Sequence, residues 1–281
     1  MRVLLTNDDG IDAEGLQALR RALLEVPGIE LAVIAPDGNR SAFARMITTR
    51  RPLWVSEVDF GDGTRGYATD GTPVDCVRLA NLGLVEDFRP DVVVSGINHG
   101  ANLGDDISYS GTVAAAIEGV ILGVPGVAVS QQSTGRAYDH RFGSRFEFGP
   151  AAEFAARVVG ELAETADEQA GRLPLPAGTL LNINVPAGEV RGVEVTRIGK
   201  RVYRDELRLD HEDAEGRRFW IYGEDAGFED EPGTDVAAVH AGAIAVTPVH
   251  FDLTDVAGMD ALARYDLARL VAPAARGVEG A

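Results

Sequence analysis

Cysteine and long apolar runs are scarce in this sequence, and each scarcity excludes a class of protein. Cys76 is the only cysteine, so no disulfide forms within one chain. No apolar run reaches the roughly 20 residues that a membrane-spanning helix needs. The first residues also lack the basic and apolar segments of a signal peptide. We therefore expect a soluble, cytoplasmic protein that does not bind a membrane.

Positive charge is also in short supply. The 281 residues include 26 Lys and Arg against 44 Asp and Glu, which gives a formal net charge of −18. A nucleic-acid polymer needs a basic face along its phosphate backbone, so this balance argues against such a partner. A small anionic substrate remains compatible, because local N–H donors or a bound cation can override the overall charge.

Aliphatic segments alternate with helix-like segments over the first 195 residues, and this alternation predicts an α/β fold. Aliphatic strands separated by helices are typical of a mostly parallel sheet that is covered on both faces, which makes three layers. We predict strands at 2–6, 30–36, 91–96, 126–130 and 179–186, and helices at 13–26, 110–123 and 151–166.

The pattern changes near residue 196. Residues 197–233 are charged and aromatic, with glycine turns, and predict an extended hairpin arm. Such an arm buries little surface by itself, so we expect it to pack on another subunit. Residues 237–249 predict a returning strand and residues 258–271 a closing helix. We expect residues 1–281 to form a single domain, with a catalytic core at 1–195 and the arm, strand and helix at 196–281.

Three of the predicted strands end in small residues that carry oxygen atoms. In open α/β sheets, ligands bind beyond the carboxyl ends of the strands, so we expect these residues to meet at one edge. They are Asn7, Asp8 and Asp9 after the first strand, Asp37, Asn39, Arg40 and Ser41 after the second, and Asn98, Asn102, Asp105, Asp106, Ser110 and Thr112 after the third.

Asp8 and Asp9 either form an ordinary turn or one side of a cation site. Asp-Gly is a common turn pair, yet a helical pattern follows here in place of a second strand. Carboxylates and neutral oxygens suit Mg²⁺ or Mn²⁺, and a divalent cation would relieve the repulsion between the two carboxylates. Ser41 alone is a weak signal, because a loop serine is usually a cap or turn residue.

Residues 110–112 either cap a helix or bind an anion. Ser110 precedes a run of small residues, and a helix N-terminus offers unpaired N–H groups and a positive dipole end. The preceding stretch GINHGANLG contains Asn98, Asn102 and His99, and its glycines allow a ligand to approach the backbone or simply shape a loop. A cation held by carboxylates beside an anion site indicates phosphate chemistry.

Six stretches of the chain together resemble the SurE (survival protein E) family of 5′-nucleotidases. They are LLTNDDGIDAEGL, GNRSA, GTPVDCVRLA, SGINHGANLGDDISYSGTVAAAIEG, TRIGKRVY and AVTPVHFDLT, which extend from about Met1 to Asp255. The resemblance implies a Rossmann-like core and a cytoplasmic phosphatase that acts on nucleoside 5′-monophosphates, with 3′-monophosphates and short polyphosphate as further candidate substrates. It also implies a homodimer or homotetramer that exchanges C-terminal elements.

The resemblance assigns roles to the residues gathered above. Asp8, Asp9, Ser41 and Asn98 would hold one divalent cation per subunit, Mg²⁺ or Mn²⁺. The hypothesis is a metal-assisted hydrolysis of a phosphomonoester in which Asp8 or Asp9 orients the water or accepts its proton. The phosphate contacts would come from Asn98, Asn102, Ser110, Gly111 and Thr112. A covalent aspartyl phosphate stays open as an alternative.

Two non-enzymatic functions are alternatives to this hypothesis. A nucleotide sensor would bind the same ligand without turnover. A signalling receiver domain would need a lysine beyond a strand end, whereas Lys200, the only lysine, falls in the predicted arm. Base and sugar preference do not follow from the phosphate contacts. Arg136, Tyr138 and Phe142 are candidates to approach a base.

Overall fold

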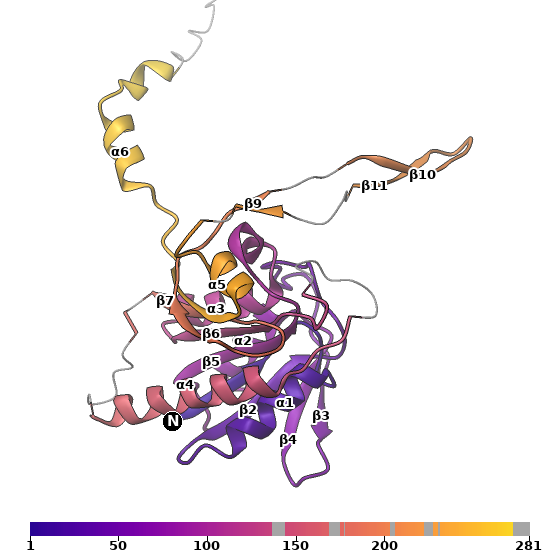
Figure 1. The fold of residues 1–281 in the computed structure, drawn as a ribbon, viewed down its shortest axis with the longest axis vertical. Helices are drawn as coiled ribbons and strands as arrows, with labels where there is room; N and C mark the ends of the chain where they lie inside the picture. Colours follow the sequence, from indigo (N-terminus) through magenta and orange to yellow (C-terminus); the bar gives the residue numbers. More distant parts are fainter. Residues whose placement is uncertain are drawn as a thin grey trace, which may run out of the picture. The chain divides into compact units, whose positions relative to one another are not determined.

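The computed structural model describes residues 1–136, 144–168, 175, 176, 178–202, 206–221, 227–229 and 231–271. Its central feature is a nine-stranded sheet with the strand order β3-β4-β2-β1-β5-β6-β7-β13-β8 (Figure 1). The strands are β1 (Arg2–Thr6), β2 (Glu30–Pro36), β3 (Val55–Asp59), β4 (Arg65–Thr69), β5 (Val92–His99), β6 (Gly126–Gln131), β7 (Thr179–Val185), β8 (Gly192–Val195) and β13 (Ala243–His250). Neighbours pair in parallel except β3 with β4 and β7 with β13. The predicted mostly parallel α/β fold is confirmed.

Strand β1 marks the point where the strand order reverses. It pairs in parallel with β2 on one side and with β5 on the other. The chain passes from β1 to β2 in one direction and reaches β5 in the other, so the loops after these three strands diverge from one place. Ligands of open α/β sheets bind at such a switch point. The three loops are those whose polar residues the sequence predicts to meet.

Helices cover both faces of the sheet. The helices described within residues 1–251 are α1 (Glu14–Leu24), α2 (Pro73–Asn81), α3 (Gly111–Ile121), α4 (Gly149–Glu168) and α5 (Asp235–Ala241), with a 3₁₀ turn η1 (Gly104–Ser108). Residues of α1 and α4 share one buried cluster, whereas residues of α2 and α3 contribute to clusters on the opposite face. None of the described helices is long and apolar enough to cross a membrane.

The strand predicted at 237–249 is half wrong. Helix α5 occupies Asp235–Ala241, and the strand starts only at Ala243. The helix begins at Thr234, whose hydroxyl accepts a hydrogen bond from the N–H of Ala237, and it ends at Gly242 in the left-handed conformation with φ 86°. These two caps divide a continuous apolar run that, without them, fits a strand as well as a helix.

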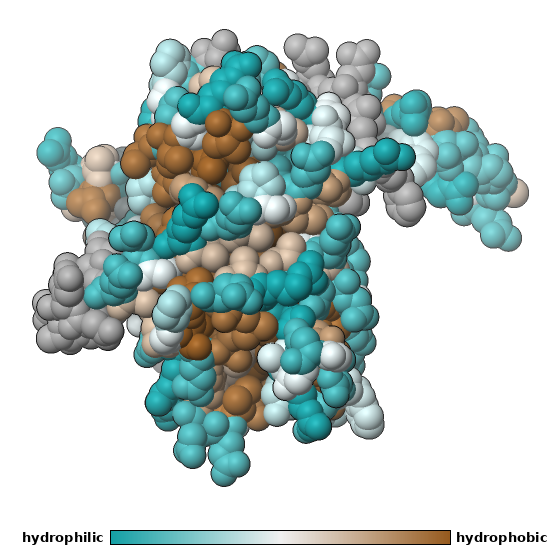
Figure 2. Space-filling model, turned by 60° about the horizontal axis from the view of Figure 1, so that its bottom comes forward, coloured by the Kyte–Doolittle hydropathy of each residue, from teal (hydrophilic) through white to brown (hydrophobic). Residues whose placement is uncertain are grey.

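An exposed hairpin lies within the predicted arm. Strands β10 (Arg208–Glu212) and β11 (Arg217–Trp220) pair antiparallel, and every one of their residues is exposed. A smaller antiparallel pair joins β9 (Arg201–Val202) to β12 (Gly227–Phe228). Patches of apolar surface also lie between hydrophilic regions of the molecule (Figure 2).

The chain divides into two compact units, Met1–Phe251 and Asp252–Ala281. In the second unit, the predicted closing helix is two short pieces, α6 (Val256–Ala263) and the 3₁₀ turn η2 (Leu267–Leu270). Neither piece has a buried residue. The first unit contains all of the main sheet.

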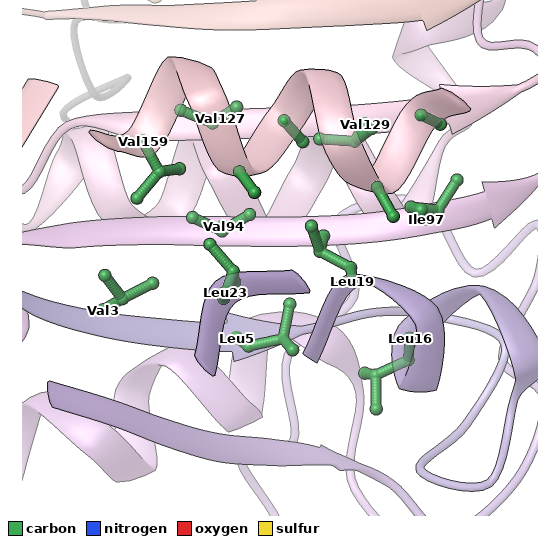
Figure 3. Close-up of a cluster of buried hydrophobic side chains, with 14 of the residues drawn as sticks. Val3, Leu5, Leu16, Leu19, Leu23, Val94, Ile97, Val127, Val129 and Val159 are labelled. Carbon is green, nitrogen blue, oxygen red and sulfur yellow. The ribbon is translucent and has the colours of Figure 1, made fainter. Parts of the chain in front are cut away.

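The core follows from the alternation of side chains along the strands. Val3 and Leu5 of β1 belong to the cluster under α1 and α4, whereas Leu4 between them belongs to the cluster on the opposite face. Figure 3 shows Leu19 of α1 and Val159 of α4 together with strand side chains in the first of these clusters. Because both faces of β1 are buried, the polar residues that follow it start from a fixed position.

Candidate active site

Asp8 lies buried directly after β1, with 3 % of its surface exposed. Its carboxylate accepts a hydrogen bond from the hydroxyl of Thr112, in the first turn of α3. Gly111 makes this approach possible, since a Cβ there would lie 2.8 Å from Oδ2 of Asp8. Burial, and after it the charge of Asp9, raises the pKa of Asp8 to about 6. The fold therefore holds a carboxylate where its charge is unfavourable without a further partner.

Asp9 joins the loops that follow all three strands. Its Oδ1 accepts a hydrogen bond from Nδ2 of Asn39 at 3.2 Å, and its Oδ2 accepts one from the backbone N–H of His99 at 3.1 Å. Oδ1 of Asn39 in turn accepts the backbone N–H of Ser41 at 2.9 Å. The predicted convergence is therefore confirmed for these loops, and Asn39 connects Ser41 to Asp9.

Asn98 and His99 stand at the end of β5. Asn98 is half-buried, and its Nδ2 donates to the carbonyl of Gly100 at 2.8 Å. The imidazole Nε2 of His99 accepts the backbone N–H of Gly15 at 3.3 Å, at the start of α1. The His99 ring also packs 4.8 Å from the ring of Phe148, measured between centroids. This packing makes His99 part of the framework behind Asp9.

Asn102 is fixed from two neighbouring strands. Its Nδ2 donates to Oγ of Ser130 at 2.8 Å, and its backbone N–H donates to Oδ1 of Asn184 at 2.8 Å. The side chains of Asn182 and Asn184 both donate to its carbonyl, at 2.9 and 3.0 Å. The sequence prediction missed this support. Its signal was the presence of two asparagines inside the otherwise aliphatic strand TLLNINV.

Ser110 caps α3, because its hydroxyl accepts a hydrogen bond from the N–H of Val113 at 3.1 Å. The capping role predicted as one alternative is therefore present. The stretch before α3 is held by Asp235, whose carboxylate accepts the N–H groups of Gly104 at 2.9 Å and Gly199 at 2.7 Å. Burial raises the pKa of Asp235. No motif in the sequence pointed to this residue.

The 131–150 segment is described only in part. Arg136 has a left-handed backbone with φ 56°, and its carbonyl accepts a hydrogen bond from Nε2 of Gln132 at 3.4 Å. Tyr138 and Phe142, the other two candidates for a base contact, lie outside the described residues.

The donor set at the switch point consists of oxygens. Among the described residues, no group of three or more His, Cys, Asp and Glu side chains is placed to hold a metal. The candidates are instead the carboxylates of Asp8 and Asp9 with the neutral oxygens of Ser41 and Asn98. Arg40, next to Ser41, forms an ion pair with Asp37 at 2.5 Å. Two adjacent carboxylates, one of them buried, fit a hard divalent cation.

The fold and this site define an α/β protein with an acidic site at the switch point of its parallel sheet, beside the start of a helix. The family model for survival protein SurE matches residues 3–205. The chain belongs to this family, as the sequence resemblance predicted.

Named relatives cover almost the whole chain. The 5′-nucleotidase SurE of Rubrobacter xylanophilus is 52 % identical over 276 residues, which are 96 % of this chain and 99 % of the relative. The 5′-nucleotidase SurE of Symbiobacterium thermophilum is 45 % identical over 270 residues, covering 94 % of this chain and 98 % of the relative. The crystal structure of the SurE protein from Aquifex aeolicus superposes with a TM-score of 0.72 at 36 % identity, covering 93 % of this chain and 98 % of that one.

Proposed function

We propose that this chain is a metal-dependent 5′-nucleotidase, a phosphatase that hydrolyses nucleoside 5′-monophosphates to a nucleoside and phosphate. Full-length relatives that carry the name 5′-nucleotidase support the activity. The observation that carries the assignment is the buried carboxylate of Asp8, beside Asp9 and against the first turn of α3. A cation between the carboxylates and an anion at the helix start is the arrangement that a phosphomonoester needs.

Asp8, Asp9, Ser41 and Asn98 would hold one divalent cation per subunit, Mg²⁺ or Mn²⁺. When bound, such an ion supplies Lewis acidity, which polarises a phosphate oxygen and lowers the pKa of a water molecule. The hydrogen bond from Thr112 keeps the Asp8 carboxylate in one orientation. The hydrogen bonds from Asn39 and the His99 backbone do the same for Asp9. The fold thus aligns the donors before a ligand arrives.

The phosphate contacts fall to the residues around the start of α3. The N–H groups of Gly111 and Thr112 belong to the first turn, where helix N–H groups lack intrahelical partners. We assign Ser110, Asn102 and Asn98 to the same phosphate group. In hydrolysis a water oxygen bonds to phosphorus, the bond to the sugar oxygen breaks, and the water proton passes to the Asp8–Asp9 pair before the leaving oxygen is protonated.

We further infer a homodimer or homotetramer that exchanges C-terminal elements. The β10–β11 hairpin and α6 have no buried residue within their described parts, although they contain Trp220 at 53 % and Met259 at 58 % exposure. Large apolar side chains in this state are typical of surfaces that associate. The single buried cysteine, Cys76, fits a reducing compartment, the cytoplasm.

The test is phosphate release from AMP with Mn²⁺ and then with EDTA, for the wild type and two variants. Asp9→Asn removes a cation ligand and should lower kcat/KM by at least about 100-fold. Asp12→Asn removes the same charge from an exposed position in the same loop and serves as the control. Turnover that persists in EDTA, or in Asp9→Asn, would contradict the proposal.

A substrate panel extends this test. 5′-AMP, 3′-AMP and tripolyphosphate, each with Mg²⁺ and with Mn²⁺, give the order of preference, and we expect 5′-AMP to be hydrolysed fastest. A nucleotide sensor would instead bind AMP in calorimetry and release no phosphate under any of these conditions.

A further inference from the structure

The connection that carries Ser41 is long and open. It spans residues 37–54 between β2 and β3, all of them described, and forms neither helix nor strand. Ser41 is exposed, and nearby Ala42 and Ala44 have left-handed backbones with φ 61° and 48°. A segment without helix or strand pairing depends on its other contacts for its position. The contacts that anchor it therefore decide where Ser41 stands relative to Asp8 and Asp9.

One anchor is a buried carboxylate on α3. The Glu118 side chain is 1 % exposed and forms ion pairs with two arginines. Nη2 of Arg45, from the 37–54 connection, lies 3.2 Å from Oε2. Nη2 of Arg78, from α2, lies 2.7 Å from Oε1. The Arg45 guanidinium also stacks over the ring of Phe251, 4.9 Å from its centroid. A buried carboxylate between two arginines is a specific attachment point, because loss of a partner leaves buried charge without compensation.

Helix α3 relates this anchor to the active site. Glu118 follows Gly111 by seven residues, which is close to two full turns, so the two lie on the same side of the helix about 10 Å apart along its axis. Gly111 touches Asp8, and Glu118 holds Arg45. Helix α3 therefore links Asp8 to the middle of the connection, in addition to the hydrogen bond that the backbone N–H of Arg40 donates to the Asp8 carbonyl at 2.6 Å.

The other contacts of the connection lie on either side of Arg45, and the nearest is the carbonyl of Met46, which accepts the Thr72 hydroxyl at 2.7 Å. The Asn39 side chain holds the backbone N–H of Ser41. Further along, the backbone N–H and the hydroxyl of Thr48 donate to the two carboxylate oxygens of Asp75, at 3.0 and 2.7 Å. Arg45 is four residues from Ser41 and is the side chain that ties this middle part to the helix of the phosphate site.

We propose that Arg45 is a positioning residue that, through Glu118, holds Ser41 within reach of the cation shared by Asp8 and Asp9. The inference rests on the proposed function, because it needs that cation. Arg45 itself would touch neither substrate nor ion. Its loss should weaken cation binding and leave the chemistry of the loaded site close to normal.

Arg78 provides a matched control for Arg45. Both side chains pair with Glu118 and are similarly exposed, at 39 % for Arg45 and 41 % for Arg78. Arg45→Met and Arg78→Met each remove one charge and retain an unbranched apolar stem. Both leave Glu118 with one arginine, so a general electrostatic effect on the cation would appear in both variants. Only Arg45→Met removes a contact that the 37–54 connection itself makes with α3.

The measurement is Mn²⁺ binding by calorimetry without substrate, together with the Mn²⁺ dependence of AMP hydrolysis. We expect Arg45→Met to raise the Mn²⁺ dissociation constant about tenfold, with kcat at saturating Mn²⁺ within about twofold of the wild type. Arg78→Met should stay within about twofold in both quantities. Arg45→Lys, which retains the charge, should fall between the wild type and Arg45→Met, and it serves as the test if Arg45→Met does not fold.

Equal dissociation constants for the wild type and the Arg45 variants would overturn the inference and leave the proposed function standing. So would equal weakening in Arg78→Met, which would show a general effect of unpairing Glu118. Failure of the wild type to bind Mn²⁺ would overturn the proposed cation site itself, and this inference with it. The three outcomes are distinct in one set of titrations.

Discussion

We predict that the Asp8 carboxylate destabilises the folded protein when no cation is bound. Its pKa rises from the ordinary value of 3.8 to about 6, because the carboxylate is buried and lies beside Asp9. This difference in pKa between the unfolded and the folded protein corresponds to about 3 kcal/mol of lost stability once the group is ionised. Asp8→Asn removes this charge and retains an oxygen that can accept a hydrogen bond from the Thr112 hydroxyl.

The expected gain is smaller than the full electrostatic figure. The new amide brings N–H groups that lack an obvious acceptor, which costs about 1–3 kcal/mol. We therefore expect Asp8→Asn in EDTA to be more stable than the wild type by about 1 kcal/mol near neutral pH, and by at most about 2 kcal/mol. In a unit of this size, that corresponds to a rise in Tm of about 2–4 °C for each kcal/mol.

The pH dependence has a definite sign. The folded-state pKa of Asp8 lies above its unfolded value, so the protonated form favours the folded state. The advantage of Asp8→Asn should therefore be complete above about pH 7 and shrink as the pH falls through about 6, and near pH 4 the variant should be the less stable protein, because only the cost of its unpaired amide remains. Thermal unfolding in EDTA across this range measures it, with Asp12→Asn as the exposed control.

Adding Mn²⁺ should reverse the order of stability. A ligand at about 100 times its dissociation constant stabilises the folded state by about 2.7 kcal/mol, and only the wild type retains both carboxylates. An Asp8→Asn variant that is less stable than the wild type in EDTA near neutral pH would refute the reasoning.

Two further predictions concern other parts of the fold. Gly111→Ala should lower kcat/KM by about 100-fold in steady-state kinetics, because a Cβ 2.8 Å from Oδ2 of Asp8 must displace the carboxylate. Gly149→Ala is the control and should leave kcat/KM unchanged, because Gly149 begins α4 and no atom lies within 4 Å of the new Cβ. Hydrogen bonds from Arg20 and Thr64 hold the pKa of Asp62 well below its usual range. The Tm difference between wild type and Asp62→Asn should be constant above about pH 4 and shrink as the pH falls further, whereas a difference that grows in acid would contradict this.

Strands β1, β2, β5, β6 and β7 could be predicted because each contains a run of buried aliphatic residues next to a helical pattern. Strand β3 could not, because it lies at the edge of the sheet with exposed and half-buried residues, so no apolar run marks it. Helix α2 also escaped prediction, although a usable signal was present. The side chain of Thr72 caps the N–H of Asp75, the Asp75 side chain accepts the N–H of Thr72, and Pro73 begins the helix.

The sequence predicts which residues of the candidate site follow the strand ends, but not the hydrogen bonds between them. The sequence places Asp8 and Asp9 after a buried strand, and parallel topology brings them to the other loops. The bonds that hold them join distant residues, since Thr112 is 104 positions from Asp8 and Asn39 is 30 from Asp9. Glu118 shows the limit most clearly, because a single acid inside an apolar helix gives no hint of the two arginines that reach it.

Helix α6 has a consequence for how this protein behaves on dilution. Its eight residues include Val256, Met259 and Leu262, three positions apart and each at least 58 % exposed. An isolated helix shorter than about 12–15 residues is marginal in water, so this one needs an apolar surface to fold against. Its helicity should then depend on protein concentration, and circular dichroism of a dilution series becomes a measure of association.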